Sequence, residues 1–275
     1  MNKNELDAAA SPEAEFGDFL RSSREAKGWR QEDLAYAAGC SPTHISALEN
    51  GRRRPTPQIG RKLDSAFGWD RVFANRAIDA RSSVLLEGFE KYVAQESKAE
   101  ELRLFTLGII PGVLQTLDYA RAIAAGAVRR GSITQEGADD RVAVLARRQA
   151  RLRREQPPVI HAVLDESCLR RPVGGPGVMS AQFDHLLEFA KLPNSLLQVA
   201  PLAIGEDRAF DLPVNIITLP DRSLMAYAES AQQGNLERDS DAVRPTLAAY
   251  YQLQGLALSQ AETVALICQL REELP

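Results

Sequence analysis

A polar segment between residues 41 and 54 carries the side chains of this sequence that are best suited to chemistry. It brings hydroxyls and an imidazole close together at Ser41, Thr43, His44 and Ser46. Three arginines follow at Arg52, Arg53 and Arg54. Hydroxyl and imidazole groups can bond to the edges of bases, and arginines neutralise phosphates. The segment therefore predicts a local contact surface for double-stranded DNA.

Two short helices are expected to hold these side chains. The first covers 31–38 and ends at Gly39, where a left-handed turn residue is needed. After a turn, Ser41 as N-cap and Pro42 at the first helical position open a second helix that Gly51 closes. Helical periodicity turns Ile45 and Leu48 inward and the polar residues outward. A helix, tight turn and helix of this kind predict a helix-turn-helix.

Further amphipathic helices surround this pair, over 15–28, from Thr56–Pro57 onward, and over 72–78. We therefore expect an all-α, five-helix domain over 15–78, preceded by a flexible tail over 1–14. Gln31 begins the bracing helix and is placed to bond a phosphate together with the helix amides. The alternative is a small helical bundle with an ordinary solvated arginine face.

The ordered motifs LR..RE..G, QEDLA and S..HIS.LENG.R.P in this region resemble the Xre/Cro/phage-repressor family. The resemblance implies a DNA-binding domain that is five-helical and usually dimeric. It implies that Gln31 binds phosphate, that Asn50 and Arg52 lie at the backbone-contacting end, and that the recognition-helix head is formed by Ser41, Thr43, His44 and Ser46. Arg30 departs from the family's usual Ser or Thr N-cap, which weakens the cap by about 1 kcal/mol and adds a cation near the phosphates.

The rest of the chain has a different sequence pattern, which predicts both helices and strands. A mixed-charge helical pattern over 79–104 is typical of a connector helix. Beyond it, short apolar runs bounded by turn residues indicate strands at VIHAVLD, SLLQVAPL, VNIITLP and LMAYAE, and helical patterns cover about 178–192 and the C-terminus. Ser259 with Glu262 resembles a capping box. The expected fold class is multi-domain, with an α+β regulatory or partner-binding domain over 105–275.

This second region contains IPG.LQT.DYAR and LDE..LRRPVGG, which resemble the C-terminal domain of the large WhiJ-like set of actinobacterial Xre regulators. The resemblance implies an antitoxin-like protein, or a regulator of development or antibiotic production. It also implies that a small acidic partner protein is encoded nearby.

The composition of the 275 residues is that of a globular protein, with 44% hydrophobic and 25% charged residues. A net charge of −4 argues against general coating of polyanions. The chain shows no apolar run long enough to span a membrane and no signal-peptide pattern, so we expect a cytoplasmic protein. Cys40, Cys168 and Cys268 fit no metal spacing and are interpreted as thiols.

We expect no enzyme, no cofactor and no metal site. His161, Asp165 and Ser167 suggest a triad, but the chain has no GxSxG, so a strand-end hydrogen-bond pair is the alternative. The glycine-rich segment 170–177 could hold an anion or be a structural loop. Arginines along 147–154 could extend a DNA footprint or form a solvated face that pairs with an acidic partner.

These observations predict a sequence-specific DNA-binding transcriptional regulator of the Xre type, acting as a homodimer and controlling its own locus together with development or secondary metabolism. The alternative is an antitoxin-like interaction module that binds a small acidic partner, with DNA binding serving autoregulation.

Overall fold

The computed structural model describes residues 12–80, 88–229 and 233–275. The chain divides into two compact units between residues 84 and 85. Most of the predicted tail, residues 1–11, lies outside the described residues. Its end is corrected by the structure, because the first helix begins at Pro12, with acidic residues Glu13 and Glu15 in its first turn and Ala14 buried. Acidic side chains at a helix N-terminus interact favourably with the helix dipole.

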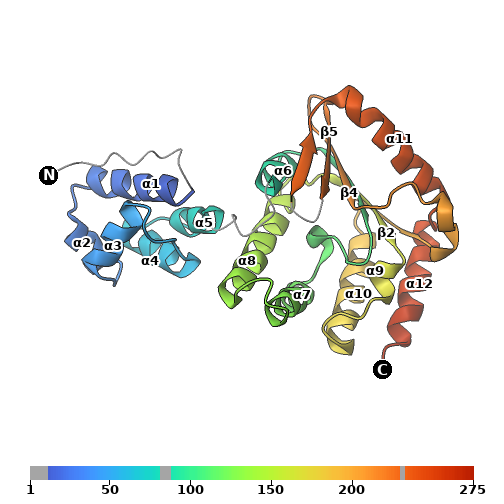
Figure 1. Cartoon of the computed structure of the whole chain (residues 1–275), viewed down its shortest axis with the longest axis horizontal. Coiled ribbons are helices and arrows are strands. Elements are labelled where there is room, and N and C mark those ends of the chain that lie inside the picture. The colour runs from blue at the N-terminus through green and yellow to red at the C-terminus, as the bar shows by residue number, and fades with distance from the viewer. Residues whose placement is uncertain (1–11, 81–87, 230–232) are drawn as a thin grey trace. The chain divides into compact units, whose positions relative to one another are not determined.

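The first unit is all-helical, as predicted (Figure 1). Its described part contains five helices: α1 (Pro12–Ala26), α2 (Gln31–Ala37), α3 (Pro42–Glu49), α4 (Pro57–Phe67) and α5 (Val72–Asp79). Their inward faces form one core around Phe16, Leu20, Leu34, Ile45, Leu48, Leu63 and Phe73. The apolar periodicity of the sequence therefore sets the packing of this unit.

Helices α1 and α3 approach each other closely at Gly17. A Cβ atom at this position would lie 2.5 Å from the carbonyl oxygen of Leu48, which is a backbone atom of α3. Only glycine fits here without moving one helix. This contact fixes α1 across the end of α3.

The second unit is built around a six-stranded mixed sheet of order β3-β2-β1-β4-β5-β6. Strands β1 (Glu101–Thr106), β2 (Val159–Asp165) and β3 (Ser195–Ala200) are parallel. Strands β4 (Val214–Thr218), β5 (Leu224–Glu229) and β6 (Gly234–Glu237) continue the sheet in antiparallel fashion from β1. The direction of the sheet therefore changes between β1 and β4.

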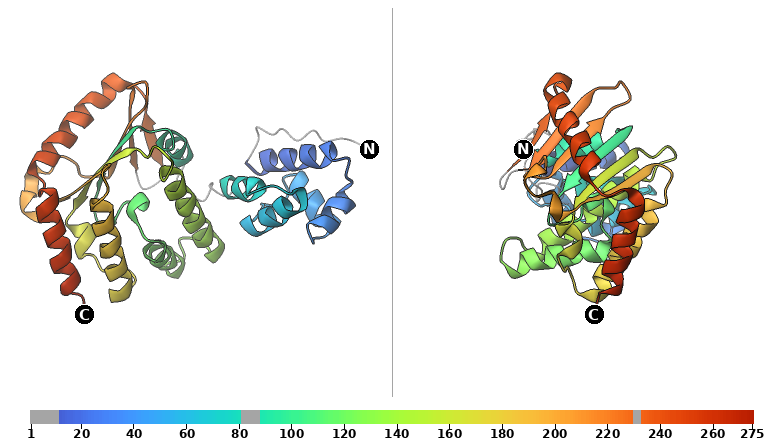
Figure 2. Two further views of the ribbon diagram at one scale, coloured as in Figure 1. Left: turned by 180° about the vertical axis from the view of Figure 1, so that it is seen from behind. Right: turned by 90° about the vertical axis from the view of Figure 1, so that its right-hand side faces the viewer.

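Helices cover both faces of this sheet (Figure 2). On one face, α11 (Ser240–Leu256) packs through Tyr250 and Leu253 on Phe105 and Val163. The other face packs against α6 (Phe89–Glu96), α7 (Leu117–Arg129), α8 (Gln135–Leu152), α10 (Pro176–Ala190) and α12 (Gln260–Glu272). A short α9 (Ser167–Arg170) and the 3-10 turns at Gly112–Leu114 and Leu202–Asp207 complete the unit. The predicted α+β class is confirmed.

Strands β2 to β5 and the helix α10 form where the sequence predicts them. The connector helix predicted over 79–104 is corrected, because the described part contains α6 at Phe89–Glu96 and then strand β1 from Glu101. Tyr92 of α6 is fully buried in the core of the second unit. Leu102 and Leu104 point to one side of β1 and Phe105 to the other, so this strand is buried on both faces.

Side chains of α12 cover the outer edge of β3. The backbone N–H of Leu197 donates to Oε1 of Gln260 at 3.2 Å, and that of Val199 donates to Oγ1 of Thr263 at 3.0 Å. The carbonyl of Val199 accepts from the N–H of Leu258. The predicted capping box of Ser259 and Glu262 is present at the start of α12 and fixes its first turn.

Candidate nucleic-acid interface

The α2–turn–α3 segment has the geometry that its caps predict. Gly39 has φ +60°, a left-handed conformation that ends α2 and turns the chain toward α3. The Oγ of Ser41 accepts a hydrogen bond from the N–H of His44 at 3.2 Å, and Pro42 occupies the first turn of α3. Ile45 and Leu48 are fully buried. The opposite side of α3 is therefore held toward solvent.

A shallow hollow lies beside α3 in the first unit. Gln31 from α2 lines it together with Pro42, Thr43, Ser46, Ala47 and Arg52. Thr43 and Arg52 are exposed, and Gln31 and Ser46 are half-buried. The structure thus brings four of the predicted contact residues to one surface.

The remaining predicted residues do not line this hollow. Arg53 is exposed, and Arg54 pairs with Glu13 at 2.8 Å, so its charge is partly neutralised by α1. His44 is half-buried, and burial, together with the charges of Arg53 and Lys62, lowers its pKa below the usual value. The imidazole is therefore neutral at pH 7 and can accept as well as donate a hydrogen bond.

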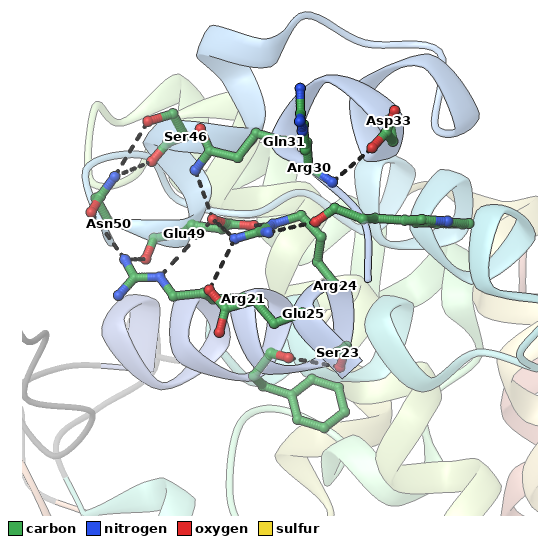
Figure 3. A network of polar contacts seen from close by, with 12 residues as sticks. Arg21, Ser23, Arg24, Glu25, Arg30, Gln31, Asp33, Ser46, Glu49 and Asn50 are labelled. Atoms are coloured by element: carbon green, nitrogen blue, oxygen red, sulfur yellow. Dashed lines mark hydrogen bonds and ion pairs between the residues drawn. The ribbon is translucent and has the colours of Figure 1, made fainter. Parts of the chain in front are cut away.

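A buried ion pair ties α1 to the end of α3 (Figure 3). Glu49 is completely buried, and its carboxylate accepts from Nε of Arg24 at 2.6 Å and from Nη2 at 3.0 Å. The hydrogen bond to Glu49 is the main cause of the raised pKa of Arg24. Arg24 also donates to the carbonyl of Trp29 at 2.8 Å, which fixes the loop before α2. A bidentate pair of this kind has a defined geometry.

The same carboxylate reaches α2 through Gln31. The amide nitrogen of Gln31 donates to Oε2 of Glu49 at 2.7 Å. Arg21 donates to the carbonyl of Glu49 at 2.9 Å and to Oδ1 of Asn50 at 3.0 Å, and Asn50 donates to the carbonyl of Ser46 at 2.7 Å. In Figure 3 the side chains of Arg21, Arg24 and Gln31 converge on Glu49 from α1 and α2. Gln31 and Asn50, both predicted to bind the DNA backbone, are therefore also part of the internal network.

Arg30 precedes α2 and makes no side-chain cap. Instead, its backbone N–H donates to the carboxylate of Asp33 at 2.7 Å (Figure 3). Asp33 supplies a negative charge to the helix N-terminus, where the dipole favours it. The guanidinium of exposed Arg30 is therefore not needed for capping.

Sequence reasoning missed Glu49, Arg24 and Arg21. One signal was present, because Arg24 follows Leu20 at helical spacing and Glu49 follows Leu48 on the buried side of α3. A cation and an anion on the apolar faces of two helices are expected to pair, since buried charges are rarely left alone.

The triad residues of the second unit do not assemble. Ser167 donates to the carboxylate of Asp165, which Arg208 contacts at 3.4 Å, and Asp165 also accepts from the N–H of Ser167. Among the described residues Nδ1 of His161 has no hydrogen-bond partner, and it lies 3.7 Å from Glu101. In the described ranges, no group of three or more His, Cys, Asp or Glu side chains is arranged to hold a metal.

The glycine-rich segment 170–177 forms the turn that leads into α10. Gly174 and Gly175 both have positive φ, and Pro176 starts α10 directly after them. Cys40, Cys168 and Cys268 are free thiols. No helix within the described residues is long and apolar enough to cross a membrane.

The fold and the α2–α3 surface define a helix-turn-helix protein, and residues 15–74 match a family described as a helix-turn-helix domain. Residues 89–269 match the family described as "Domain of unknown function (DUF5753)". Because this match covers more than half of the chain, the protein belongs to the DUF5753 family.

Two curated relatives match over shorter stretches. The uncharacterized HTH-type transcriptional regulator YqaF of Bacillus subtilis is 33% identical over 52 residues, which cover 19% of this chain and 68% of the relative. Multiprotein-bridging factor 1 of Schizosaccharomyces pombe is 29% identical over 66 residues, or 24% of this chain. This match spans 45% of that relative's length. No solved structure gives a significant match.

Proposed function

We propose that the protein is a sequence-specific DNA-binding transcriptional regulator of the Xre type, which binds as a homodimer. The observation that carries the proposal is the exposed polar head of α3, framed by Gln31 and Arg52 around one hollow. A single recognition helix contacts few base pairs, so two copies on a two-fold site supply specificity. The similarity to an HTH-type regulator supports the same class of function.

The test is a competition gel shift of the full chain on the DNA upstream of its own gene. Binding that survives an excess of random duplex supports the proposal. Equal competition by random duplex would show that this DNA holds no operator. A salt series then measures how many phosphates the protein neutralises.

Thr43→Ala is expected to weaken binding to the operator by about 1–3 kcal/mol and to leave binding to random DNA nearly unchanged, and we expect the same of His44→Ala. The reason is that a hydroxyl or imidazole at the head of α3 reads bases, whereas random DNA is held by phosphate contacts. Fluorescence anisotropy on both duplexes measures the difference. Equal losses on the two duplexes would assign these residues to backbone contacts.

Arg52→Ala is expected to weaken binding to both duplexes and to reduce the slope of log affinity against log salt by about one. Arg52 is exposed beside the hollow, where a phosphate would lie. Arg244→Ala is the matched control, because Arg244 is an exposed arginine of α11 that pairs with Asp241. A slope that stays unchanged in Arg52→Ala removes this residue from the phosphate contacts.

We propose as a second function that the protein binds a small acidic partner protein. The resemblance of its second region to WhiJ-like, antitoxin-like regulators suggests such a partner, and it also suggests a role in development or secondary metabolism. The observation that favours it is the accumulation of arginine on α7 and α8 and in the residues directly after each helix, in a chain of net charge −4. The exposed members include Arg121, Arg129, Arg130, Arg141, Arg153 and Arg154. Co-purification of the neighbouring gene product, lost at high salt, tests this function. Failure of the two purified proteins to associate at low salt contradicts it.

A further inference from the structure

A cleft in the second unit lies outside the helices proposed to contact DNA. It has a volume of about 340 Å³ and continues into a hollow of about 270 Å³ between α7 and α8. Sites for small molecules have volumes of this order. Both spaces share the lining residues Phe89, Gly112, Gln115, Arg148 and Glu229.

The cleft lies at the carboxyl end of β1, where this strand neighbours β4. Thr106 and Leu107 at the end of β1, and Pro213 and Asn215 at the start of β4, form one wall. Strand β1 is parallel to β2 but antiparallel to β4, so the strand direction changes here. Crevices outside the carboxyl ends of parallel strands are common ligand sites.

The charges that face the cleft are unequally compensated. Glu96 accepts from Nε and Nη2 of Arg148 at 2.9 and 2.8 Å and from the hydroxyl of Tyr92 at 2.7 Å. Glu229 accepts from the hydroxyl of Tyr227 at 3.0 Å, and its charge is among the causes that raise the pKa of Arg148, although within the described ranges no direct ion pair joins it to a cation. The main cleft therefore contains two carboxylates and one guanidinium. Arg141 lines only the adjoining hollow.

Aromatic rings flank the same carboxylate. The Tyr92 and Tyr227 rings stack with centroids 4.4 Å apart, and Phe89 packs on the edge of Tyr227 at 5.8 Å. The guanidinium carbon of Arg148 lies 4.7 Å from the Phe89 ring centre, so this wall already accommodates one cation. Aromatic faces combined with a carboxylate favour positively charged ligands.

We propose that this cleft binds a small organic cation with an apolar body. Its ammonium group lies between the carboxylate of Glu229 and the amide of Asn215, next to Tyr227. Its body extends into the hollow lined by Ile123, Val142 and Leu145. The proposal concerns the second unit alone and does not depend on DNA binding by the first.

Isothermal titration of the full chain with three probes of one size tests the proposal: phenethylamine, phenethyl alcohol and phenylacetate. We expect the amine to bind at least about tenfold more tightly than the alcohol, because only the amine interacts with Glu229 as a cation. Tighter binding of phenylacetate would make Arg148 an anion site and overturn the proposal. Absence of binding by all three would show that the cleft is a packing void.

Two variants with opposite expected effects on amine affinity test where the ligand binds. Glu229→Gln is expected to weaken amine binding by about tenfold, and Asn215→Asp is expected to strengthen it. Glu188→Gln removes an exposed carboxylate of α10, which pairs with Lys191, and is the control with unchanged affinity. If the unfolding temperature of Glu229→Gln is unchanged, its weaker amine binding comes from the lost carboxylate and not from a loss of stability. Equal amine affinity in all three variants contradicts the proposed site, and Asn215→Asp decides alone if Glu229→Gln does not fold.

Discussion

Replacement of Glu49 by alanine is expected to lower the free energy of unfolding of the helix-turn-helix unit by about 3–5 kcal/mol. The substitution removes the buried carboxylate that pairs with Arg24, which is 8% exposed, and leaves this cation only the exposed Glu25. It also releases Gln31 from α3. Domains of this size have total stabilities of about 5–15 kcal/mol, so the substitution removes a substantial part of the free energy that holds the recognition surface together.

Tryptophan fluorescence during denaturation measures this change selectively. The chain has two tryptophans, Trp29 and Trp69, and both pack on Phe67 of the first unit. Glu25→Ala is the matched control, because Glu25 contacts the same arginine at 3.4 Å from an exposed position. We expect it to cost less than about 1 kcal/mol. Equal losses in both variants would show that the buried pair contributes no more than a surface pair.

Replacement of Arg148 by alanine is expected to destabilise the second unit by a similar amount, about 3–5 kcal/mol. Glu96 is 1% exposed, and Arg148 supplies two of its hydrogen bonds. Burial alone would lower the pKa of Arg148, but the charge and hydrogen bonds of Glu96 outweigh it and raise this pKa, so the guanidinium stays ionised. Calorimetry is expected to show the unfolding temperature of this unit falling by on the order of 10 °C.

A double variant distinguishes the contribution of the Glu96–Arg148 charges to stability from the contribution of their packing. Glu96→Met with Arg148→Met replaces both ions by apolar side chains of similar length, and such replacements are often neutral or stabilising. We therefore expect most of the lost stability to return. Arg121→Ala removes an exposed arginine of α7 that pairs with Asp118 and is the control. A double variant as unstable as Arg148→Ala would mean that shape, not charge, governs this contact.

Local signals made much of the fold predictable. The α2–α3 turn follows from Gly39, Ser41 and Pro42, whose preferences act within a few residues. Strands β2 to β5 follow from short β-branched or leucine-rich runs between turn residues. Strand β1 was missed because Glu101 and Arg103 give it the charge pattern of an exposed helix. In the sheet, Arg103 is buried against Thr218 and Tyr251 from distant segments.

The site was predictable only where it is local. The head of α3 could be identified from the outward positions of one helix. The partners of Glu49 come from two other helices, so their meeting depends on tertiary packing that periodicity does not specify. The cleft of the second unit is less predictable still, since Phe89, Arg148 and Glu229 come from segments separated by dozens of residues.

The covered edge of β3 has a consequence for self-association. An open strand edge is a template on which another chain can add a strand, and this is a common route to aggregation. The side chains of Gln260 and Thr263 accept hydrogen bonds from outward-facing N–H groups of β3, so α12 covers the edge to which another strand could add. A chain that ends before α12 would present this edge to its neighbours. Helix α12 therefore leaves these two amides of β3 unavailable for pairing with a strand of another chain.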